Sequence, residues 1–140
     1  HQIPVYCLGA APGVAQRAID NVSAQVGALN IAGIHDGFFD SAEEQEIIKS
    51  IADSKAKLVF VALGVPKQEQ WIAEKLSHLD GVVAIGIGGS FDVLAGNIPR
   101  APEWMQQNRL EWLYRLYLEP QRIGRMLAIP KFMWTVIRNK

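Results

Sequence analysis

The sequence predicts an α/β fold: an open, Rossmann-like, mostly parallel sheet with flanking helices, followed by an α-helical C-terminal appendage. Four short apolar runs rich in β-branched residues alternate with stretches of helical periodicity. The runs are continuously apolar rather than alternating, which is typical of parallel strands buried on both faces and joined by right-handed crossovers. Because the pattern changes after the fourth run, we expect two parts, residues 1–99 and 100–140.

Each expected element has a local reason in the sequence. The strands are the four apolar runs: 3–8, 29–34, 58–63 and 82–87. Helical patterns follow the first three runs: about 12–26, from 41 onward, and 67–76. We expect the second helix to begin at Ser41, because Ser41 and Glu44 have the spacing of a capping box. Residues 103–139 follow a helical pattern throughout, broken at Pro120 and Pro130, each of which should open a new helix.

The composition is that of a soluble globular chain, 49% hydrophobic and 20% charged over 140 residues. Residues 1–99 carry six Lys and Arg against eleven Asp and Glu, whereas residues 100–140 carry eight against three. The basic tail favours an anionic partner such as a membrane surface, phosphate or nucleic acid. Cys7, the single cysteine, should be a small buried hydrophobe, and no apolar run approaches the ~20 residues that span a bilayer.

Four glycine-containing loops are expected at the carboxyl edge of the sheet, where open parallel sheets bind ligands. They are GAAPG, HDGFFD, GVPKQE and GIGGSFDVLAG, at residues 9–13, 35–40, 64–69 and 86–96. Glycine allows positive φ and close approach of the backbone, which suits a phosphate or sugar on main-chain N–H groups. One such loop is more simply explained as a βα turn, whereas four together favour a binding site.

The motifs narrow the chemistry of that site. GAAPG is not the dinucleotide fingerprint G-x-G-x-x-G, and no P-loop motif occurs. His35, His78 and the acidic residues lack metal-ligand spacing, so we predict no metal site. His35 and Asp36 stand at a strand end and could do acid–base chemistry, but a turn histidine and an Asx-turn aspartate explain them equally well.

Four polar residues near these loops are candidates for substrate contacts. Glu69, in a first helical turn, is explained by the helix dipole, worth roughly 0.3–1 kcal/mol. Gln68 has no such explanation, and its amide could serve sugar hydroxyls or an acetamido group. Lys67 could neutralise a phosphate or merely point into water. Asp92 could accept ribose hydroxyls or cap a short helix over residues 93–95.

The segments LGAAPGVA, GVPKQEQWI, GIGGSFDVLAGNIPRAPEW and LEWLYRLYLEPQRIGR, in this order, closely resemble the WecG/TagA/CpsF glycosyltransferases of bacterial surface-polymer synthesis. The resemblance runs from about Val5 to Arg125. It implies an inverting enzyme that requires no metal or other cofactor and transfers N-acetylmannosamine, its uronic acid or another N-acetylhexosamine from a UDP-sugar. The implied acceptor is undecaprenyl-diphosphate-linked N-acetylglucosamine at the cytoplasmic membrane face, in surface polysaccharide or teichoic acid synthesis.

The resemblance also implies roles for individual residues. Phe38, where many members have Tyr, should stack on uracil, Gln68 should be the catalytic residue facing the sugar or diphosphate, and Asp92 should contact the nucleoside. With the loops, the expected donor-binding residues are Gly9, Gly37, Phe38, Gly64, Lys67, Glu69, Gly88, Gly89 and Asp92. The arginines expected to hold the lipid diphosphate are Arg115, Arg122 and Arg125.

The chain also departs from the family pattern. The family has a preceding N-terminal segment with the acceptor pocket and an aspartate expected to act as general base, which inverting transfer needs. Because the chain starts with His1 and enters a strand almost at once, we expect part of a longer protein, inactive alone and prone to self-association through uncovered apolar surface. A catalytically inactive nucleotide-sugar-binding module docked at a membrane is the alternative.

The C-terminal segment is basic and amphipathic, with Arg122 and Arg125 on one face. Such helices bind anionic bilayers, each basic residue contributing about 1 kcal/mol, although a helical layer packed on protein would show a similar pattern. With the resemblance, we expect peripheral association with the inner face of the bacterial cell membrane. Nucleic acid is not an expected partner, because the tail's tryptophans lie among leucines and the glycine-loop part is acidic.

Overall fold

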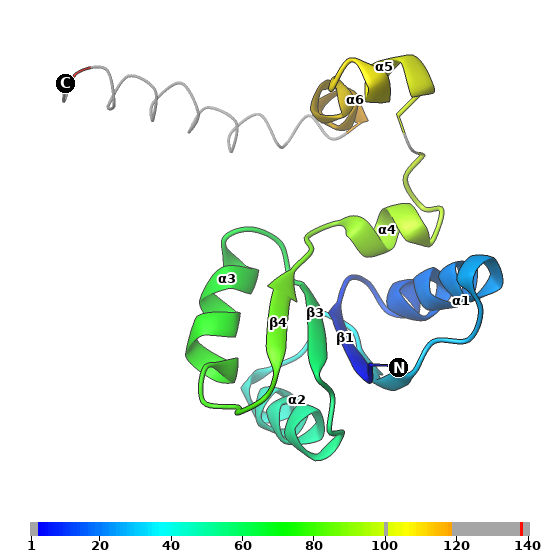
Figure 1. Ribbon diagram of the computed structural model, residues 1–140. Helices are drawn as coiled ribbons and strands as arrows, with labels where there is room; N and C mark the ends of the chain where they lie inside the picture. Colours follow the sequence, from blue (N-terminus) through cyan, green and yellow to red (C-terminus); the bar gives the residue numbers. More distant parts are fainter. Residues whose placement is uncertain (1–2, 100, 119–137, 139–140) are drawn as a thin grey trace. The chain divides into compact units, whose positions relative to one another are not determined.

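A computed structural model describes residues 3–99, 101–118 and 138 (Figure 1). The chain forms two compact units, His1–Pro99 and Arg100–Lys140. Along the described ranges, no helix combines the length and the apolarity needed to cross a bilayer.

The first unit contains a four-stranded sheet in the order β2-β1-β3-β4, and every neighbouring pair is parallel. The strands are β1 Val5–Gly9, β2 Ile31–His35, β3 Leu58–Ala62 and β4 Val83–Gly86. The predicted parallel α/β fold is therefore confirmed. The order reverses direction between β1 and β3, and this reversal is the point at which open α/β sheets place their ligands.

Helices cover both faces of the sheet. They are α1 Val14–Val26, α2 Ser41–Asp53, α3 Lys67–Trp71, its π-helical continuation η1 Ile72–Leu76, and α4 Ser90–Leu94. Residues of α1 and α4 share a buried cluster with alternate β1 residues, whereas α2, α3 and η1 pack on the other face. The crossovers after β1 and β3 run in opposite directions along the sheet. Because both are right-handed, their helices are expected on opposite faces.

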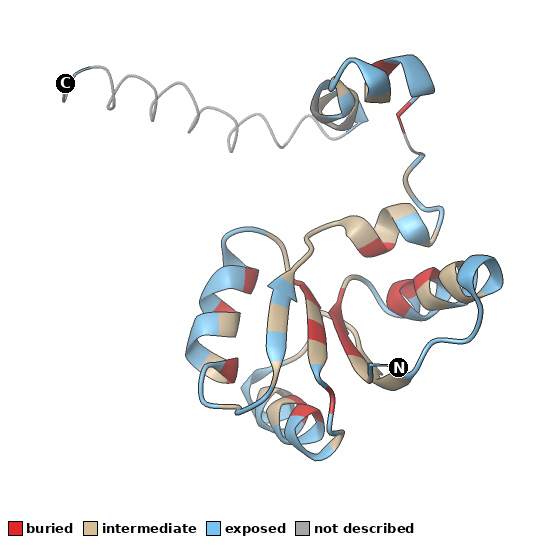
Figure 2. Ribbon diagram, viewed as in Figure 1, coloured by how far each residue is buried: buried red, intermediate tan, exposed pale blue. Residues whose placement is uncertain are grey.

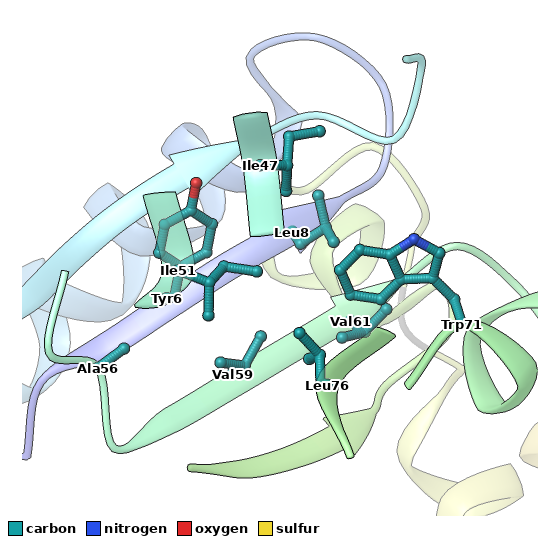
Figure 3. Packing of buried hydrophobic residues seen from close by; sticks show 9 residues of the cluster. All are labelled: Tyr6, Leu8, Ile47, Ile51, Ala56, Val59, Val61, Trp71 and Leu76. Atoms are coloured by element: carbon teal, nitrogen blue, oxygen red, sulfur yellow. The ribbon is translucent and has the colours of Figure 1, made fainter. Parts of the chain in front are cut away.

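The cluster on the α2/α3 face contains the most completely buried side chains of the described chain (Figure 3). Its members come from β1, β3, α2, α3, η1 and the connection between α2 and β3: Tyr6, Leu8, Ile47, Ile51, Ala56, Val59, Val61, Trp71 and Leu76. Buried aliphatic and aromatic side chains each contribute about 1.5–3 kcal/mol of transfer free energy, so this cluster fixes the positions of α2 and α3 against the sheet.

The opposite face is less completely covered. Cys7 lies buried there against α1, as predicted, and burial raises the pKa of its thiol to about 11. An apolar pocket of about 560 Å³ opens between α1, α4 and the sheet, with Phe60 and Ile87 among its lining residues.

On β4, Val83 and Ile85 are exposed, so the prediction of burial on both faces holds for β1 and β3 but is wrong for β4 (Figure 2).

Helix α2 begins at Ser41, but its cap differs from the predicted one. The N-cap is Asp40, whose Oδ1 accepts hydrogen bonds from the backbone N–H groups of Ala42 (2.8 Å) and Glu43 (2.9 Å). Glu43 Oε2 in turn accepts from the Asp40 backbone N–H at 3.0 Å, which completes a capping box one residue earlier than expected. The two hydrogen bonds that the Asp40 carboxylate accepts from the backbone of Ala42 and Glu43 lower its pKa.

The second unit contains α5 Glu103–Gln107 and α6 Glu111–Leu118 among its described residues. The expectation of a helical pattern from residue 103 onward is wrong at 108–110, where Arg109 adopts a left-handed φ of 58° and separates the two helices. Gln106 Nε2 donates to the Ala101 carbonyl at 2.6 Å and so ties the start of the unit to α5. Pro120 and Pro130 lie outside the described residues.

Candidate functional site

The four glycine-containing loops follow β1, β2, β3 and β4 and therefore lie at one edge of the parallel sheet. Backbone hydrogen bonds join the first two loops to each other and to the end of β3. Gly37 N donates to the Ala10 carbonyl at 2.8 Å, and Ala10 N donates to the Ala62 carbonyl at 3.0 Å. The loop after β4 is held by Gln68, a side chain of α3.

Gly9 is required by the close approach of β1 to β3. Its φ is +121°, and a Cβ atom there would lie 2.4 Å from the Ala62 carbonyl oxygen. Gly37 packs onto the same point, since its Cβ would lie 3.2 Å from the Gly9 Cα. Only glycine tolerates both the positive φ of Gly9 and its close approach to Ala62. This explains why β1 ends in glycine at the point where the strand order reverses.

The loop after β2 presents an exposed aromatic ring. Asp36 Oδ1 accepts from the Phe38 backbone N–H at 2.9 Å, which is the Asx-turn explanation of this aspartate. His35 Nδ1 lies 3.0 Å from the Asp36 carbonyl oxygen, and its ring meets Phe39 edge to face. Phe39 packs against the core, whereas Phe38 is 72% exposed, so its ring is accessible to a planar ligand.

Gln68 is buried at the start of α3, with an exposed fraction of only 3%. Its Oε1 accepts from the Gly88 backbone N–H at 2.9 Å, and its Nε2 donates to Glu69 Oε1 at 2.8 Å. Among the described residues it is the one buried side chain outside the hydrophobic and aromatic classes. The amide that the sequence left without a structural explanation therefore has one, a bond to the loop after β4.

The other predicted site residues are spread along the same edge. Lys67 is exposed, with its Nζ 5.6 Å from the centre of the Phe39 ring. Gly64, Gly88 and Gly89 lie in the loops after β3 and β4, and the positive φ angles of Gly64 (79°) and Gly88 (54°) favour glycine there.

Asp92 does not cap a helix over residues 93–95. Helix α4 begins earlier, at Ser90, with Gly89 as its N-cap, so Asp92 lies in its first turn. Asp92 Oδ1 instead accepts from Asn97 Nδ2 at 3.3 Å, and Asn97 Oδ1 accepts from Arg17 Nη2 of α1 at 3.4 Å. The carboxylate is thus linked to α1 through one asparagine.

Sequence reasoning missed a polar contact that joins α2 to α3. Trp71 Nε1 donates to Glu44 Oε1 at 2.9 Å, and Lys75 Nζ lies 2.8 Å from Glu44 Oε2. The hydrogen bond from Lys75 is the largest cause that lowers the pKa of Glu44 below its ordinary value of 4.5. The sequence pattern assigned Glu44 to a helix cap. The signal for the contact was the four-residue spacing of Trp71 and Lys75, which places both side chains on the same side of a helix.

This contact predicts a pH-dependent stability difference. Because the folded-state pKa of Glu44 is lowered, its stabilising effect is present above pH 4.5 and is lost as the pH falls through the folded-state pKa. Glu44→Gln keeps an acceptor for Trp71 but loses the ion pair with Lys75. We expect urea denaturation to find the variant less stable at pH 7, with the difference shrinking as the pH falls below 4.5. A difference that does not shrink as the pH falls would contradict this assignment.

The predicted metal-free site and the predicted lipid-diphosphate arginines concern different parts of the chain. Nowhere in ranges 3–99 and 101–118 do three or more His, Cys, Asp or Glu side chains gather as a metal site would require. The backbone of Arg115 belongs to α6, but its side chain, like Arg122 and Arg125, lies outside what the structure describes.

Comparison with known proteins gives a consistent result. A sequence model described as the glycosyl transferase WecG/TagA/CpsF family matches residues 1–140. A Bacillus subtilis protein named N-acetylglucosaminyldiphosphoundecaprenol N-acetyl-beta-D-mannosaminyltransferase is 40% identical over 136 residues, 97% of this chain and 52% of the relative. A Bacillus spizizenii protein of the same name is 42% identical over 137 residues, again 97% and 52%. The chain thus spans about half the length of these relatives.

Proposed function

Because this chain belongs to the WecG/TagA/CpsF family of glycosyl transferases, we propose that residues 1–99 bind the UDP-sugar donor of such an enzyme. The observation that carries the proposal is the meeting of four glycine-containing loops at the carboxyl edge, beside the reversal of strand order between β1 and β3. The sugar we propose is N-acetylmannosamine, which the names of the two relatives contain, or its uronate.

Individual side chains at this edge suit parts of a UDP-sugar. The exposed ring of Phe38 would stack on uracil, and the exposed ammonium of Lys67 would lie near the diphosphate. Asp92, half-buried and held by Asn97, would accept hydrogen bonds from ribose hydroxyls. The glycines of the loops, Gly9, Gly37, Gly64, Gly88 and Gly89, would let the phosphates and sugar approach the backbone closely. The N–H groups of Gly37 and Gly88 are themselves bonded to Ala10 and Gln68.

We propose that the acceptor is N-acetylglucosamine linked to undecaprenyl diphosphate, the compound in the relatives' names. Transfer with inversion needs a base for the attacking hydroxyl. Asp36, the aspartate at the end of β2, already uses Oδ1 to hold the turn to Phe38. We therefore propose that the base lies in the part of the relatives that this chain does not span. Residues 1–140 would then bind the donor without transferring its sugar.

Titration with UDP tests the donor site. We expect Phe38→Ala to weaken UDP binding by about tenfold, since stacking of a base on an aromatic ring is worth about 1–3 kcal/mol. Tyr117→Ala is the matched control, because Tyr117 is 80% exposed but lies in α6 of the second unit. Equal UDP affinity of the wild-type and Phe38→Ala chains would remove the stacking role, and no UDP binding at all would remove the proposed function.

We further propose that the basic C-terminal segment docks at the inner face of the cell membrane and holds the lipid diphosphate. Residues 100–140 carry eight Lys and Arg against three Asp and Glu, and anionic lipids attract such a segment. The double variant Arg122→Glu with Arg125→Glu should lose co-sedimentation with anionic vesicles, and wild-type binding should weaken with salt. Lys49→Glu with Lys55→Glu changes the net charge equally within the first unit and should bind as wild type. If both double variants bind alike, the assigned segment is wrong.

A further inference from the structure

We propose that Gln68 is a positioning residue, which holds the loop after β4 and the Glu69 carboxylate in place for the donor without touching the donor itself. The proposal rests on the donor site proposed above and assigns one of its residues a different kind of role. It replaces the sequence-based expectation that the Gln68 amide faces the sugar or the diphosphate.

The burial and bonding of Gln68 carry this inference. With 3% of its surface exposed, the side chain offers almost nothing to a ligand in the open edge. Its carbonyl oxygen is used by the Gly88 N–H and its amide nitrogen by Glu69, at 2.9 and 2.8 Å. Backbone bonding fixes the base of the side chain as well, since Gln68 N donates to the Gly64 carbonyl at 2.9 Å.

The end of β4 is shaped to admit this side chain. A Cβ atom on Gly86 would lie 2.5 Å from Gln68 Nε2, so only glycine at residue 86 leaves the amide in its place. Beyond Gly86, Ile87 N donates to the Val61 carbonyl at 2.8 Å, and Gly88 N donates to Gln68. The loop is thereby fastened first to β3 and then to α3, with Gln68 as the second attachment.

The Glu69 carboxylate accepts the hydrogen bond from the amide nitrogen of Gln68. Glu69 is exposed, and an exposed carboxylate normally samples several rotamers. The bond from Gln68 Nε2 restricts Glu69 Oε1, so one buried residue fixes both the backbone at Gly88 and a carboxylate at the edge where the UDP-sugar is proposed to bind. A ligand would meet Gly88, Gly89 and Glu69, each in a position that depends on Gln68.

An exchange of the two side chains separates positioning from direct contact. In Gln68→Glu with Glu69→Gln, a carboxylate at residue 68 can still accept from Gly88 N, and the amide at residue 69 can donate back to it. Gln68→Met fills similar space but accepts nothing. Two readouts are measured on the full chain: hydrogen exchange of the Gly88 amide without ligand, and affinity for UDP-N-acetylmannosamine.

We expect Gln68→Met to speed Gly88 exchange about tenfold, the equivalent of one lost hydrogen bond, and to weaken donor binding. The exchanged pair should recover the Gly88 protection and should bind the donor as Glu69→Gln alone does, because both variants lack the Glu69 carboxylate. Weaker donor binding by the exchanged pair than by Glu69→Gln, with Gly88 protection intact, would show that the native Gln68 amide contacts the donor and would overturn the proposal. Unchanged Gly88 exchange in Gln68→Met would overturn it as well.

A second pair of variants guards against misfolding as an explanation. Gly86→Ala should displace the Gln68 side chain and speed Gly88 exchange in the wild-type background. In Gln68→Ala, where that side chain is gone, adding Gly86→Ala should change Gly88 exchange little; additive effects would contradict the proposal. Failure of the wild-type chain to bind the donor would remove the proposed donor site and the ligand-positioning role with it. That failure is distinguishable, because Gly88 exchange is measured without ligand.

Discussion

Replacing Gly9 by alanine is expected to destabilise the first unit by about 3 kcal/mol or more, because strain in a glycine-only backbone conformation adds to a steric clash. The new methyl group would lie 2.4 Å from the Ala62 carbonyl oxygen, an atom of the backbone that no rotamer change can move away. Relief requires the end of β1 to separate from β3, which opens the Gly9–Ala62 pairing and the bond from Ala10 N to Ala62. Urea denaturation of the purified chain measures the loss.

Gly96→Ala is the control that isolates the steric part. Gly96 also has a positive φ, +77°, but no atom lies within 4 Å of where its Cβ would be. It should lose only the conformational cost, about 1–2 kcal/mol. Equal losses in the two variants would mean that the approach of β1 to β3 does not explain Gly9.

Trp71→Ala is the second large effect, with an expected loss of about 3–5 kcal/mol in the free energy of unfolding. Trp71 is 5% exposed and packs in the cluster of the α2/α3 face, where Figure 3 shows its ring among Leu8 and Val61. Its ring also meets Phe39 edge to face at 6.4 Å. Truncation leaves a cavity beneath α3, the helix that carries Lys67 and Gln68.

Two comparison variants assign the loss to packing and to hydrogen bonding. Trp71→Phe keeps most of the ring but removes the N–H that Glu44 accepts, and should cost about 1–2 kcal/mol. Trp104→Ala removes the same side chain from α5, where it is 59% exposed, and should cost about 0.5 kcal/mol or less. If Trp104→Ala destabilises the chain as much as Trp71→Ala, burial is not the reason for the loss.

Much of the first unit was predictable because its signals are local. Continuous apolar runs identified four strands, and their alternation with helical patterns identified a parallel sheet, which by itself places all four glycine-containing loops at one edge. The resemblance added the family, which the match over residues 1–140 confirms. These conclusions require only periodicity and order along the chain.

The errors concern choices that depend on contacts between distant residues. Asp40 and Ser41 are both good N-cap residues; in the structure Asp40 is the cap, and Glu44 instead contacts Trp71 and Lys75. Asp92 has the residue type of a cap but lies inside α4. Exposure of Val83 and Ile85 on β4 likewise depends on what covers a face, which an apolar run does not specify.

Gln68 shows the same dependence on distant residues, and its predicted contact with the donor stays a prediction. An amide in a first helical turn after a strand is ordinarily exposed, and the sequence alone therefore favoured a ligand as its partner. Its native partner, Gly88, is twenty residues away, and the space for the side chain depends on a missing Cβ at Gly86. Neither fact is visible until β3 and β4 are paired.

The central claim, a donor site at the carboxyl edge of the sheet, is tested most directly by mapping UDP-N-acetylmannosamine onto the backbone amides of the chain by NMR. We predict that the amides of Gly37 and Gly88, in the loops after β2 and β4, shift with a common saturation curve. Those of Gly27 and Gly81, which precede β2 and β4 at the opposite edge, should stay unchanged. Shifts confined to Gly27 and Gly81, or no shifts at saturating ligand, would contradict the account.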